Sequence, residues 1–506
     1  MTGLTASVET EAKLDVWVGF RLPDLDGVVE GARGVPQPDQ QLDATYYDTR
    51  DLRLARAEVT VRHRRGEGGA GGTWTVKLPS GEAGPATSRR EITLEAPGRV
   101  IPDEVSGLVR AVVRSAVLGP VARLRTRRRI VELRDASGRL LAEVDDDEVS
   151  VMDGPHLAAR FREIEVELGD EPPDDLLARV ADRLHEAGAS PAGNWPKLLR
   201  ALGPRAQAPP DVAVPRLDAG ASLADVVRAA VAGGTARLMA HDPGVRLDED
   251  IEDVHQARVA VRRLRSDLRT FRPVLDAQAT AALNDELREL AADLGTVRDA
   301  DVLLQRLSAQ AAGLPDADPG AVAGLLHRIS LSRGASRDRL LRVLDGDDYL
   351  RILDSLVAAA ASPPCLPEAD RRAAAALPDL VRKPWAHLRK AVVELDEDPP
   401  VDALHQVRIR AKRCRYAAEA AAPVVGRPAR RLARAVAGVQ GVLGDLNDAV
   451  VAETWLRDIG PSLPPPQALL AGELVGVQRR AVEVARQSWR AAWEGASDKS
   501  LRSWLR

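Results

Sequence analysis

Cysteine, aromatic residues and long apolar runs are all scarce in this 506-residue sequence. With only Cys365 and Cys414, we expect neither a disulfide framework nor a four-thiolate zinc site. No uninterrupted apolar run approaches about 18 residues, and the first residues do not resemble a signal peptide. The sequence therefore predicts a protein without a membrane partner, and the cytoplasm as its location.

Charge of one sign does not dominate either, because the formal net charge is −4. A basic site must then be a local concentration of cations, which argues against a protein that coats nucleic acid. Aromatic residues make up 3% of the chain and leave little for bases to stack on. An apolar content of 45% and a charged content of 29% are instead typical of globular proteins, and the length predicts two or three domains.

Residues 1 to about 170 show the period-2 alternation of β-strands, interrupted by Gly-rich turns. The alternating runs are 8–16, 57–64, 73–78, 89–95, 123–133, 139–149 and 161–168, and a helical stretch follows at 173–188. Residues 206–218 belong to a stretch rich in Pro and Ala without periodicity, which indicates a linker. We therefore predict a strand domain at 1–205 and a helical domain at 219–506.

The helical domain repeats its own sequence. The segment 252–275 is echoed by 402–425, and LGTVRDADV at 294–302 is echoed by LGDLNDAVV at 443–451. The offset stays near 150 residues, which predicts an internally duplicated helical bundle with repeats at about 219–360 and 370–500. The predicted fold class is multidomain α+β.

The strands carry an unusual amount of charge on one face. An ordinary half-buried strand alternates apolar with polar residues, whereas here alternation groups charges that are mostly of one sign. The groups are Glu9, Glu11 and Lys13; Arg62 and Arg64; Lys77; Arg89 and Glu91; Arg125 and Arg127; Glu143 and Asp145; and Glu163, Glu165 and Glu167.

For a single strand, a solvated face is the simpler interpretation. For seven strands together, we expect a closed barrel with these faces turned inward. Like charges about 4 Å apart repel by roughly 4 kcal/mol per pair at an effective dielectric constant near 20, so the interior needs neutralising ligands. Arginine and lysine favour a polyanion, and carboxylates favour a hard divalent cation such as Mg²⁺ or Mn²⁺. The strands therefore predict a metal-dependent site for a short run of phosphates.

The order of these motifs resembles the triphosphate tunnel metalloenzyme, or CYTH, family. The resemblance covers about residues 5–205 and rests on Glu9-x-Glu11-x-Lys13, YYDT at 46–49, VRHR at 61–64, the lysine of TVK, SRRE at 88–91, EIEVEL at 163–168 and the late Lys197. It implies an eight-stranded antiparallel β-tunnel with flanking helices, which hydrolyses triphosphates or, less often, cyclises ATP.

The resemblance also implies roles for individual residues. The implied catalytic residues are Glu9, Glu11 and Lys13. The implied ligands of Mg²⁺ or Mn²⁺ are Glu9, Glu11, Asp145, Glu163, Glu165 and Glu167. The implied phosphate-binding residues are Lys13, Arg62, Arg64, Lys77, Arg89, Arg125, Arg127 and Lys197. Alternation does not fix which arginines of 125–129 face the tunnel, because Arg128 can replace Arg127.

In the helical domain, His255, Arg258, Arg262, Arg265 and Arg269 follow one another at steps of three or four residues and share one helical face. A solvated basic face is the usual meaning of such a run, yet like charges at i, i+4 are destabilising and the arrangement occurs twice. About residues 219–500 resemble the CHAD domain, a helical bundle that binds inorganic polyphosphate. The residues that would line its anion-binding surface are His255, Arg258, Arg262, Arg265, His405, Arg408, Lys412 and Arg415.

The whole chain thus resembles bacterial CYTH–CHAD inorganic triphosphatases. We expect hydrolysis of inorganic triphosphate to pyrophosphate and phosphate, with polyphosphate bound by the helical domain. The alternatives are a polyphosphate-binding protein without catalysis, an adenylyl cyclase, and a thiamine triphosphatase-type activity. We do not expect nucleic acid to be a partner. Association with polyphosphate granules is an alternative to a free cytoplasmic location. The sequence does not indicate the oligomeric state.

Overall fold

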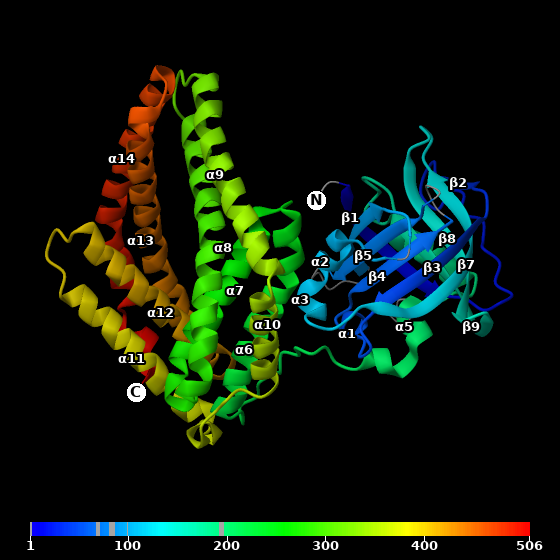
Figure 1. Cartoon of the computed structure of the whole chain (residues 1–506), viewed down its shortest axis with the longest axis horizontal. Helices are drawn as coiled ribbons and strands as arrows, with labels where there is room; N and C mark the ends of the chain where they lie inside the picture. The colour runs from blue at the N-terminus through cyan, green and yellow to red at the C-terminus, as the bar shows by residue number, and fades with distance from the viewer. Residues whose placement is uncertain (1–2, 67–70, 80–86, 99, 192–196, 506) are drawn as a thin grey trace. The chain divides into compact units, whose positions relative to one another are not determined.

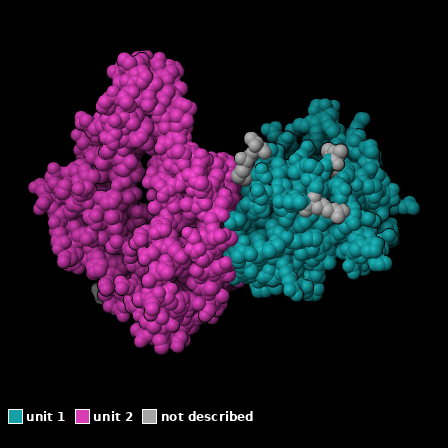
Figure 2. Space-filling view, in the orientation of Figure 1, with its two compact units in different colours: residues 1–211 teal, residues 212–506 magenta. Residues whose placement is uncertain are grey.

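The chain forms two compact units, residues 1–211 and residues 212–506, which Figure 2 distinguishes by colour. The computed structural model describes residues 3–66, 71–79, 87–98, 100–191 and 197–505. Unit 1 is built on an antiparallel sheet and unit 2 is helical, as predicted (Figure 1). Among the described residues, no helix is both long and apolar enough to cross a membrane.

Ten strands and five short helices make up the described part of unit 1. The strands are β1 (Leu4–Asp15), β2 (Arg33–Pro36), β3 (Gln40–Asp48), β4 (Thr60–Arg65), β5 (Thr73–Pro79), β6 (Thr87–Glu95), β7 (Gly119–Arg134), β8 (Leu140–Asp153), β9 (His156–Leu168) and β10 (Ser190–Pro191). The helices are α1 (Arg53–Arg56), α2 (Asp103–Leu108), α3 (Arg110–Val113), α4 (Leu176–Glu186) and α5 (Lys197–Leu202), and the 3₁₀ helix η1 (Gly203–Gln207) follows.

The strands pair in the order β1-β6-β5-β4-β3-β7-β8-β9. β1 pairs with β6 along residues 4–11 and with β9 along residues 11–15, so that the last strand of this order is hydrogen-bonded to the first. The seven alternating runs of the sequence correspond to β1 and to β4 through β9, and the family resemblance implied eight strands. The runs did not include β3, nor the short β2 and β10, which pair with β7 and β1.

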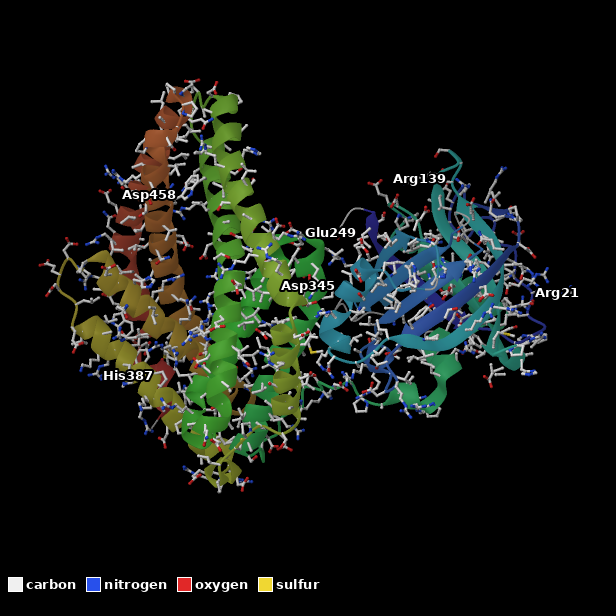
Figure 3. The ribbon with its side chains drawn as sticks, in the orientation of Figure 1. Arg21, Arg139, Glu249, Asp345, His387 and Asp458 are labelled. Carbon is white, nitrogen blue, oxygen red and sulfur yellow. The ribbon has the colours of Figure 1, made fainter. Side chains whose placement is uncertain are left out.

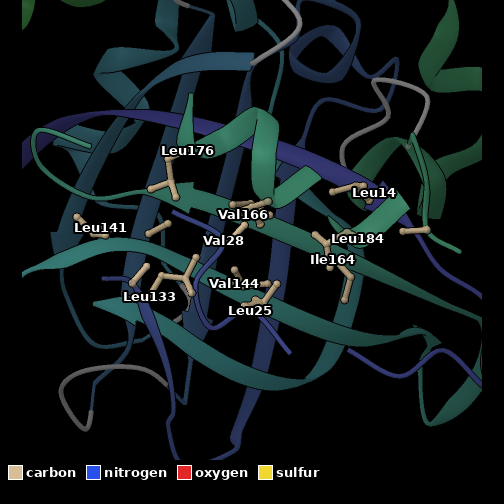
Figure 4. Close-up of a cluster of buried hydrophobic side chains, with 14 of the residues drawn as sticks. Leu14, Leu25, Val28, Leu133, Leu141, Val144, Ile164, Val166, Leu176 and Leu184 are labelled. Carbon is tan, nitrogen blue, oxygen red and sulfur yellow. The ribbon is translucent and has the colours of Figure 1, made fainter. Parts of the chain in front are cut away.

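The sheet is apolar on its outer face, where α4 covers it. Leu176 and Leu184 of α4 pack against Val144, Ile164 and Val166 of β8 and β9, all of them fully buried (Figure 4). Because side chains alternate along a strand, the residues between these positions point to the other face. On β8 and β9, the carboxylates at the alternate positions, such as Asp145 and Glu165, therefore turn inward, away from the solvent.

Unit 2 consists of nine α-helices and four short 3₁₀ helices in its described part. The α-helices are α6 (Leu223–Leu247), α7 (Ile251–Thr270), α8 (Ala277–Ala312), α9 (Pro319–Asp345), α10 (Asp347–Ala361), α11 (Ala373–Val393), α12 (Val401–Val425), α13 (Arg427–Ile459) and α14 (Pro465–Ala496). The 3₁₀ helices are η2 (Arg272–Val274), η3 (Pro367–Asp370), η4 (Gly460–Ser462) and η5 (Lys499–Leu505).

Polar side chains at the helix starts explain several boundaries. Ser222 and Asp225 form a reciprocal capping box at the start of α6. The carboxylate of Asp250 accepts a hydrogen bond from the backbone N–H of Glu252, at 2.8 Å, where α7 begins.

The two copies of the repeated motif lie at corresponding places. Consecutive helices pack as α6–α7–α8–α9 and as α11–α12–α13–α14, and α7 contacts α12. The repeated LG dipeptides place Gly295 of α8 beside the side chain of Arg258 and Gly444 of α13 beside that of Arg408. These equivalent contacts support the predicted duplication; its boundaries and those of the linker stay predictions.

Candidate functional site

A cavity of about 170 Å³ lies on the inner face of the sheet, and eight strands together with α5 contribute to its wall. Its charged lining residues are Glu11, Lys13, Arg62, Arg64, Lys77, Arg89, Glu91, Arg128, Glu143, Glu165, Glu167 and Lys197. Among the described residues, these are seven cations and five carboxylates, so the wall carries an excess of positive charge. All three lysines of the first 205 residues are present.

Three of the predicted metal ligands come together on β1 and β9. Oxygens of Glu11, Glu165 and Glu167 lie within 4.8 Å of one another. Carboxylate oxygens at such spacing suit a hard divalent cation. The ammonium of Lys13 lies 3.0 Å from Glu11 and also binds Glu165, so in this structure Lys13 neutralises two of the three ligands.

The pKa values of Glu167 and Glu165 are shifted in opposite directions. Burial raises the pKa of Glu167, and the charge of Glu165 raises it further. Burial also favours a higher pKa for Glu165, but Lys13, Lys197 and Arg128 hold that pKa well below its ordinary value. A divalent cation beside Glu167 would relieve its repulsion from Glu165, so the donor set fits a metal ion.

The cationic part of the wall comes mainly from β4, β5 and β6. Arg62 and Arg64 project from β4, Lys77 from β5 and Arg89 from β6. The ammonium of Lys77 lies 2.7 Å from the carboxylate of Glu91. Carboxylates predominate on the neighbouring strands β8, β9 and β1, which also carry Lys13. Cations predominate on the neighbouring strands β4, β5 and β6, which also carry Glu91.

Lys197 and Arg128 form ion pairs with carboxylates of β8 and β9. Lys197, at the start of α5, lies 2.7 Å from Asp147, 3.0 Å from Glu163 and 2.6 Å from Glu165. Burial lowers the pKa of Lys197, but these carboxylates raise it by more, to well above its ordinary value. The guanidinium of Arg128 donates to Asp147 at 2.8 and 2.9 Å and to Glu165 at 3.1 Å.

Two other predicted metal ligands, Asp145 and Glu163, are not part of the described cluster of Glu11, Glu165 and Glu167. Asp145 is fully buried against Arg128, and burial raises its pKa to about 9. Glu163 binds Lys197 and also Arg200, at 3.1 Å. The side chain of Glu9 lies outside the described part of the structure, although its backbone pairs with that of Arg89.

The predicted inward orientation of Arg125 and Arg127 is wrong. Their side chains are 55% and 49% exposed and form ion pairs with Asp43 and Asp39. The register places Arg128 opposite Asp147, so both share the inner face, and Arg125 and Arg127 then lie on the other face. Arg128 is the inward arginine of this segment.

Several residues of the site were not predicted from the sequence. Asp147 follows Glu143 and Asp145 at the same two-residue spacing, so alternation contained the signal. Tyr46 and Thr60 line the cavity without any charge that would mark them. Arg200 contacts Asp15 and Glu163 from α5, a position that no strand pattern predicts.

Unit 2 contains a basic groove of about 700 Å³ between α7, α8, α12 and α13, which we call the first basic groove. Its basic lining residues are His255, Arg258, Arg262, Arg265, Arg288, Arg298, Arg306, Arg408 and Lys412. Six of these were predicted from the repeated stripe. Arg288, Arg298 and Arg306 were missed because they belong to α8, whose sequence has no basic stripe.

Two predicted residues stand beside the first basic groove. His405 shares a hydrogen bond with the side-chain oxygen of Asn447, 2.7 Å from its Nδ1, and Asn447 lines the groove. Arg415 lies 3.3 Å from the carboxylate of Glu419.

Lys412 lies in an uncompensated cationic environment. Burial lowers its pKa, and the charges of Arg262, Arg408, Arg258 and Arg415 lower it further, to about 7. Within residues 197–505, no carboxylate forms an ion pair with Lys412, whereas Arg258 binds Asp299 at 2.8 Å. An anion in the groove would supply the missing counter-charge.

Comparisons with known proteins cover both units. A family model described as CYTH domain matches residues 8–191, and one described as CHAD domain matches residues 229–457. An uncharacterized protein of Mycobacterium tuberculosis is 34% identical over 487 residues, which span 89% of this chain and 88% of that protein.

Two solved structures are also similar to part of the chain. The CHAD domain from the plant Ricinus communis is 28% identical, with a TM-score of 0.48 over 57% of this chain and 96% of that chain. PptA from Streptomyces chartreusis is 23% identical, with a TM-score of 0.45 over 54% of this chain and 100% of that chain.

Proposed function

Because the chain belongs to the family in which a CYTH domain is followed by a CHAD domain, we propose that unit 1 hydrolyses inorganic triphosphate to pyrophosphate and phosphate. The reaction uses Mg²⁺ or Mn²⁺, and unit 2 binds polyphosphate. The observation that carries the proposal is the 170 Å³ cavity, which combines three clustered carboxylates with an excess of cations. A metal-bound chain of phosphates balances both sets of charge.

The proposed roles follow the two parts of the wall. Glu11, Glu165 and Glu167 would hold the divalent ion, which would polarise the terminal phosphoryl group and lower the pKa of an attacking water. Arg62, Arg64, Lys77 and Arg89 bind the phosphate oxygens and neutralise the charge that grows on the leaving pyrophosphate. Lys13 exchanges its carboxylate partners for a phosphate oxygen.

The size and lining of the cavity favour an inorganic substrate. Tyr46 is the only aromatic residue among the described lining residues, and Leu198 the only aliphatic one. A nucleoside or a thiamine ring therefore finds little apolar surface beside the phosphates.

A substrate panel tests the proposal. Phosphate release from tripolyphosphate, ATP, thiamine triphosphate and long polyphosphate should be measured with Mg²⁺ and then with Mn²⁺. We expect tripolyphosphate to be the best substrate. Formation of cyclic AMP from MnATP would support the cyclase alternative, and tight polyphosphate binding without any turnover would support a protein that only binds.

Replacing both Arg125 and Arg127 with alanine should leave tripolyphosphate hydrolysis within about twofold of the wild-type kcat/KM. Both side chains are about half exposed and form surface ion pairs, and such substitutions commonly change free energies by about 0.5 kcal/mol or less. The matched control replaces Arg62 and Arg64, which line the cavity, and should raise KM strongly. Equal losses in the two double variants would contradict the assigned inner face.

The affinity of unit 2 for polyphosphate should fall by up to about tenfold for each pH unit above pH 7, because binding takes up a proton on Lys412. Free Lys412 has a pKa of about 7, so it is largely neutral at higher pH. Bound phosphate raises that pKa, so affinity is greatest below pH 7 and declines as the pH approaches the pKa of the bound form. Titrations from pH 6 to 9 measure the effect.

The variant Lys412→Met should lose this contribution to the pH dependence, while Lys499→Met, an exposed lysine in η5, should keep it. The phosphate groups of the ligand titrate equally in all three proteins, so the difference between the profiles isolates Lys412. Identical profiles for wild type and Lys412→Met would exclude the proposed proton uptake.

A further inference from the structure

Unit 2 contains a second basic groove, of about 940 Å³, between the C-terminal part of α7 and the helices α11 and α12. It shares none of its lining residues with the first basic groove. The cations that bear on its function come from all three helices and from η2: Arg269, Arg272, Lys383, Lys390, Arg410 and Arg413.

These cations are largely uncompensated. Within residues 197–505, no carboxylate forms an ion pair with Arg269, Arg272, Lys383 or Arg413, although Lys390 lies 3.6 Å from Glu394. Burial lowers the pKa of Arg413, and the charges of Arg269 and Arg410 lower it further. Two carboxylates, those of Asp379 and Glu394, also line the groove, so its described lining keeps an excess of positive charge that an anion would reduce.

Helix stabilisation explains only part of this arrangement. Arg269 and Arg272 stand at the C-terminal end of α7, where cations interact favourably with the helix dipole. Lys383 and Arg413 lie in the middle of α11 and α12, where the dipole offers no such benefit. Their convergence on one concave surface is better explained by a ligand.

The basic stripe of α7 connects the two grooves. Arg265 lines the first groove and Arg269 lines the second, and residues four apart on a helix are neighbours. Burial lowers the pKa of Arg265 and the charge of Arg269 lowers it further, so the two guanidinium groups are close enough to interact. At 1.5 Å per residue, the stripe from His255 to Arg269 spans about 20 Å.

We infer that the second basic groove binds the continuation of a polyphosphate chain whose first part occupies the first basic groove. This inference rests on the proposed function of unit 2 and adds that the domain favours long chains over short ones. The described wall offers the ring of His387, which Figure 3 labels on α11, but no Phe, Tyr or Trp. Bases of a nucleic acid therefore find little to stack on, which favours polyphosphate.

The test replaces Arg272, Lys383 and Arg413 together with alanine in the full chain. All three are exposed, so the fold should tolerate the change, and an unchanged melting temperature verifies this. Affinity is measured for two probes: a polyphosphate shorter than about 20 Å when extended, and one several times longer. The long probe should bind the variant about tenfold more weakly than it binds the wild type, because its contacts with the second basic groove are lost. The affinity of the short probe for the variant should stay within about twofold of its affinity for the wild type.

Salt dependence gives a second readout. For a single-stranded polyanion, each neutralised charge contributes about 0.7 to the slope of log affinity against log salt, so the three substitutions should reduce the slope for the long probe by about 2. The control Arg427→Ala, Arg430→Ala and Arg431→Ala makes the same change of net charge on α13, outside both grooves. It should leave the affinity for both probes nearly unchanged.

The possible failures are distinguishable. If the wild-type chain binds neither probe, the proposed function of unit 2 is wrong and the inference falls with it. If the wild type binds both probes but the variant loses nothing, or loses both equally, the inference alone is overturned. A variant that loses single-stranded RNA binding while keeping long polyphosphate would also overturn it, because the second groove would then be a nucleic-acid site.

Discussion

Replacing Glu11 with glutamine is expected to lower metal-dependent phosphate release from tripolyphosphate by about 100-fold or more. Glu11 supplies one of the three clustered carboxylates. Changing a residue that only orients a metal ligand commonly lowers metal affinity or activity by about 10–100-fold. Loss of a ligand itself should therefore lower the activity by about 100-fold or more. Initial rates measured over a range of Mg²⁺ and Mn²⁺ concentrations separate weaker metal binding from slower turnover.

Glutamine has nearly the shape of glutamate, and Lys13 keeps its ion pair with Glu165, so the variant should fold. The matched control is Glu171→Gln, whose side chain is 93% exposed and should not affect the rate. Polyphosphate binding by unit 2 should persist in Glu11→Gln. Full activity of this variant at low metal concentration would remove Glu11 from the proposed metal site.

Replacing Arg262, Arg408 and Lys412 together with alanine should weaken polyphosphate binding by roughly 1,000-fold. These three cations line the first basic groove, and among the described residues none forms an ion pair with a carboxylate. A hydrogen bond to a charged group contributes about 1.5–3 kcal/mol, so three lost contacts exceed about 4 kcal/mol, even before the loss of long-range attraction. The measurement is an equilibrium titration repeated at several salt concentrations.

The triple variant removes like charges that repel one another, so the free energy of unfolding should not decrease for electrostatic reasons. The charge-matched control on α13, with Arg427, Arg430 and Arg431 replaced by alanine, should retain most of the affinity. Hydrolysis by unit 1 should be unchanged in both. If Glu11→Gln and the groove variant each abolished both activities, the proposed division between the units would be wrong.

Much of unit 1 was predictable because strand alternation is local. The patterns around Arg62, Lys77 and Glu165 indicated which residues share a face, and the structure places all three in the cavity wall. The rarity of lysine was equally informative, since Lys13, Lys77 and Lys197 all line the cavity. The alternation depends only on the spacing of neighbouring residues along one segment, and the rarity of lysine only on composition.

The strand β3 was missed for an equally local reason. Its alternation is short: it covers Leu42 to Tyr46 and then ends, because Tyr46, Tyr47 and Asp48 are buried in succession. Asp48 is buried because its carboxylate accepts hydrogen bonds from the backbone N–H groups of Leu54 and Ala55, each at 2.9 Å, at the start of α1. A side chain used to cap a turn does not follow the strand pattern.

The sequence by itself determined the two-part architecture, the pairing of carboxylates with cations, and the repeated basic stripe, because composition and periodicity are properties of single segments. Only the tertiary structure decided that Arg128 faces inward in place of Arg127, that Glu11, Glu165 and Glu167 gather, and that α8 adds cations to the first basic groove. Strand register and helix packing join residues far apart in the chain, and a one-residue change of register reverses every side chain of a strand.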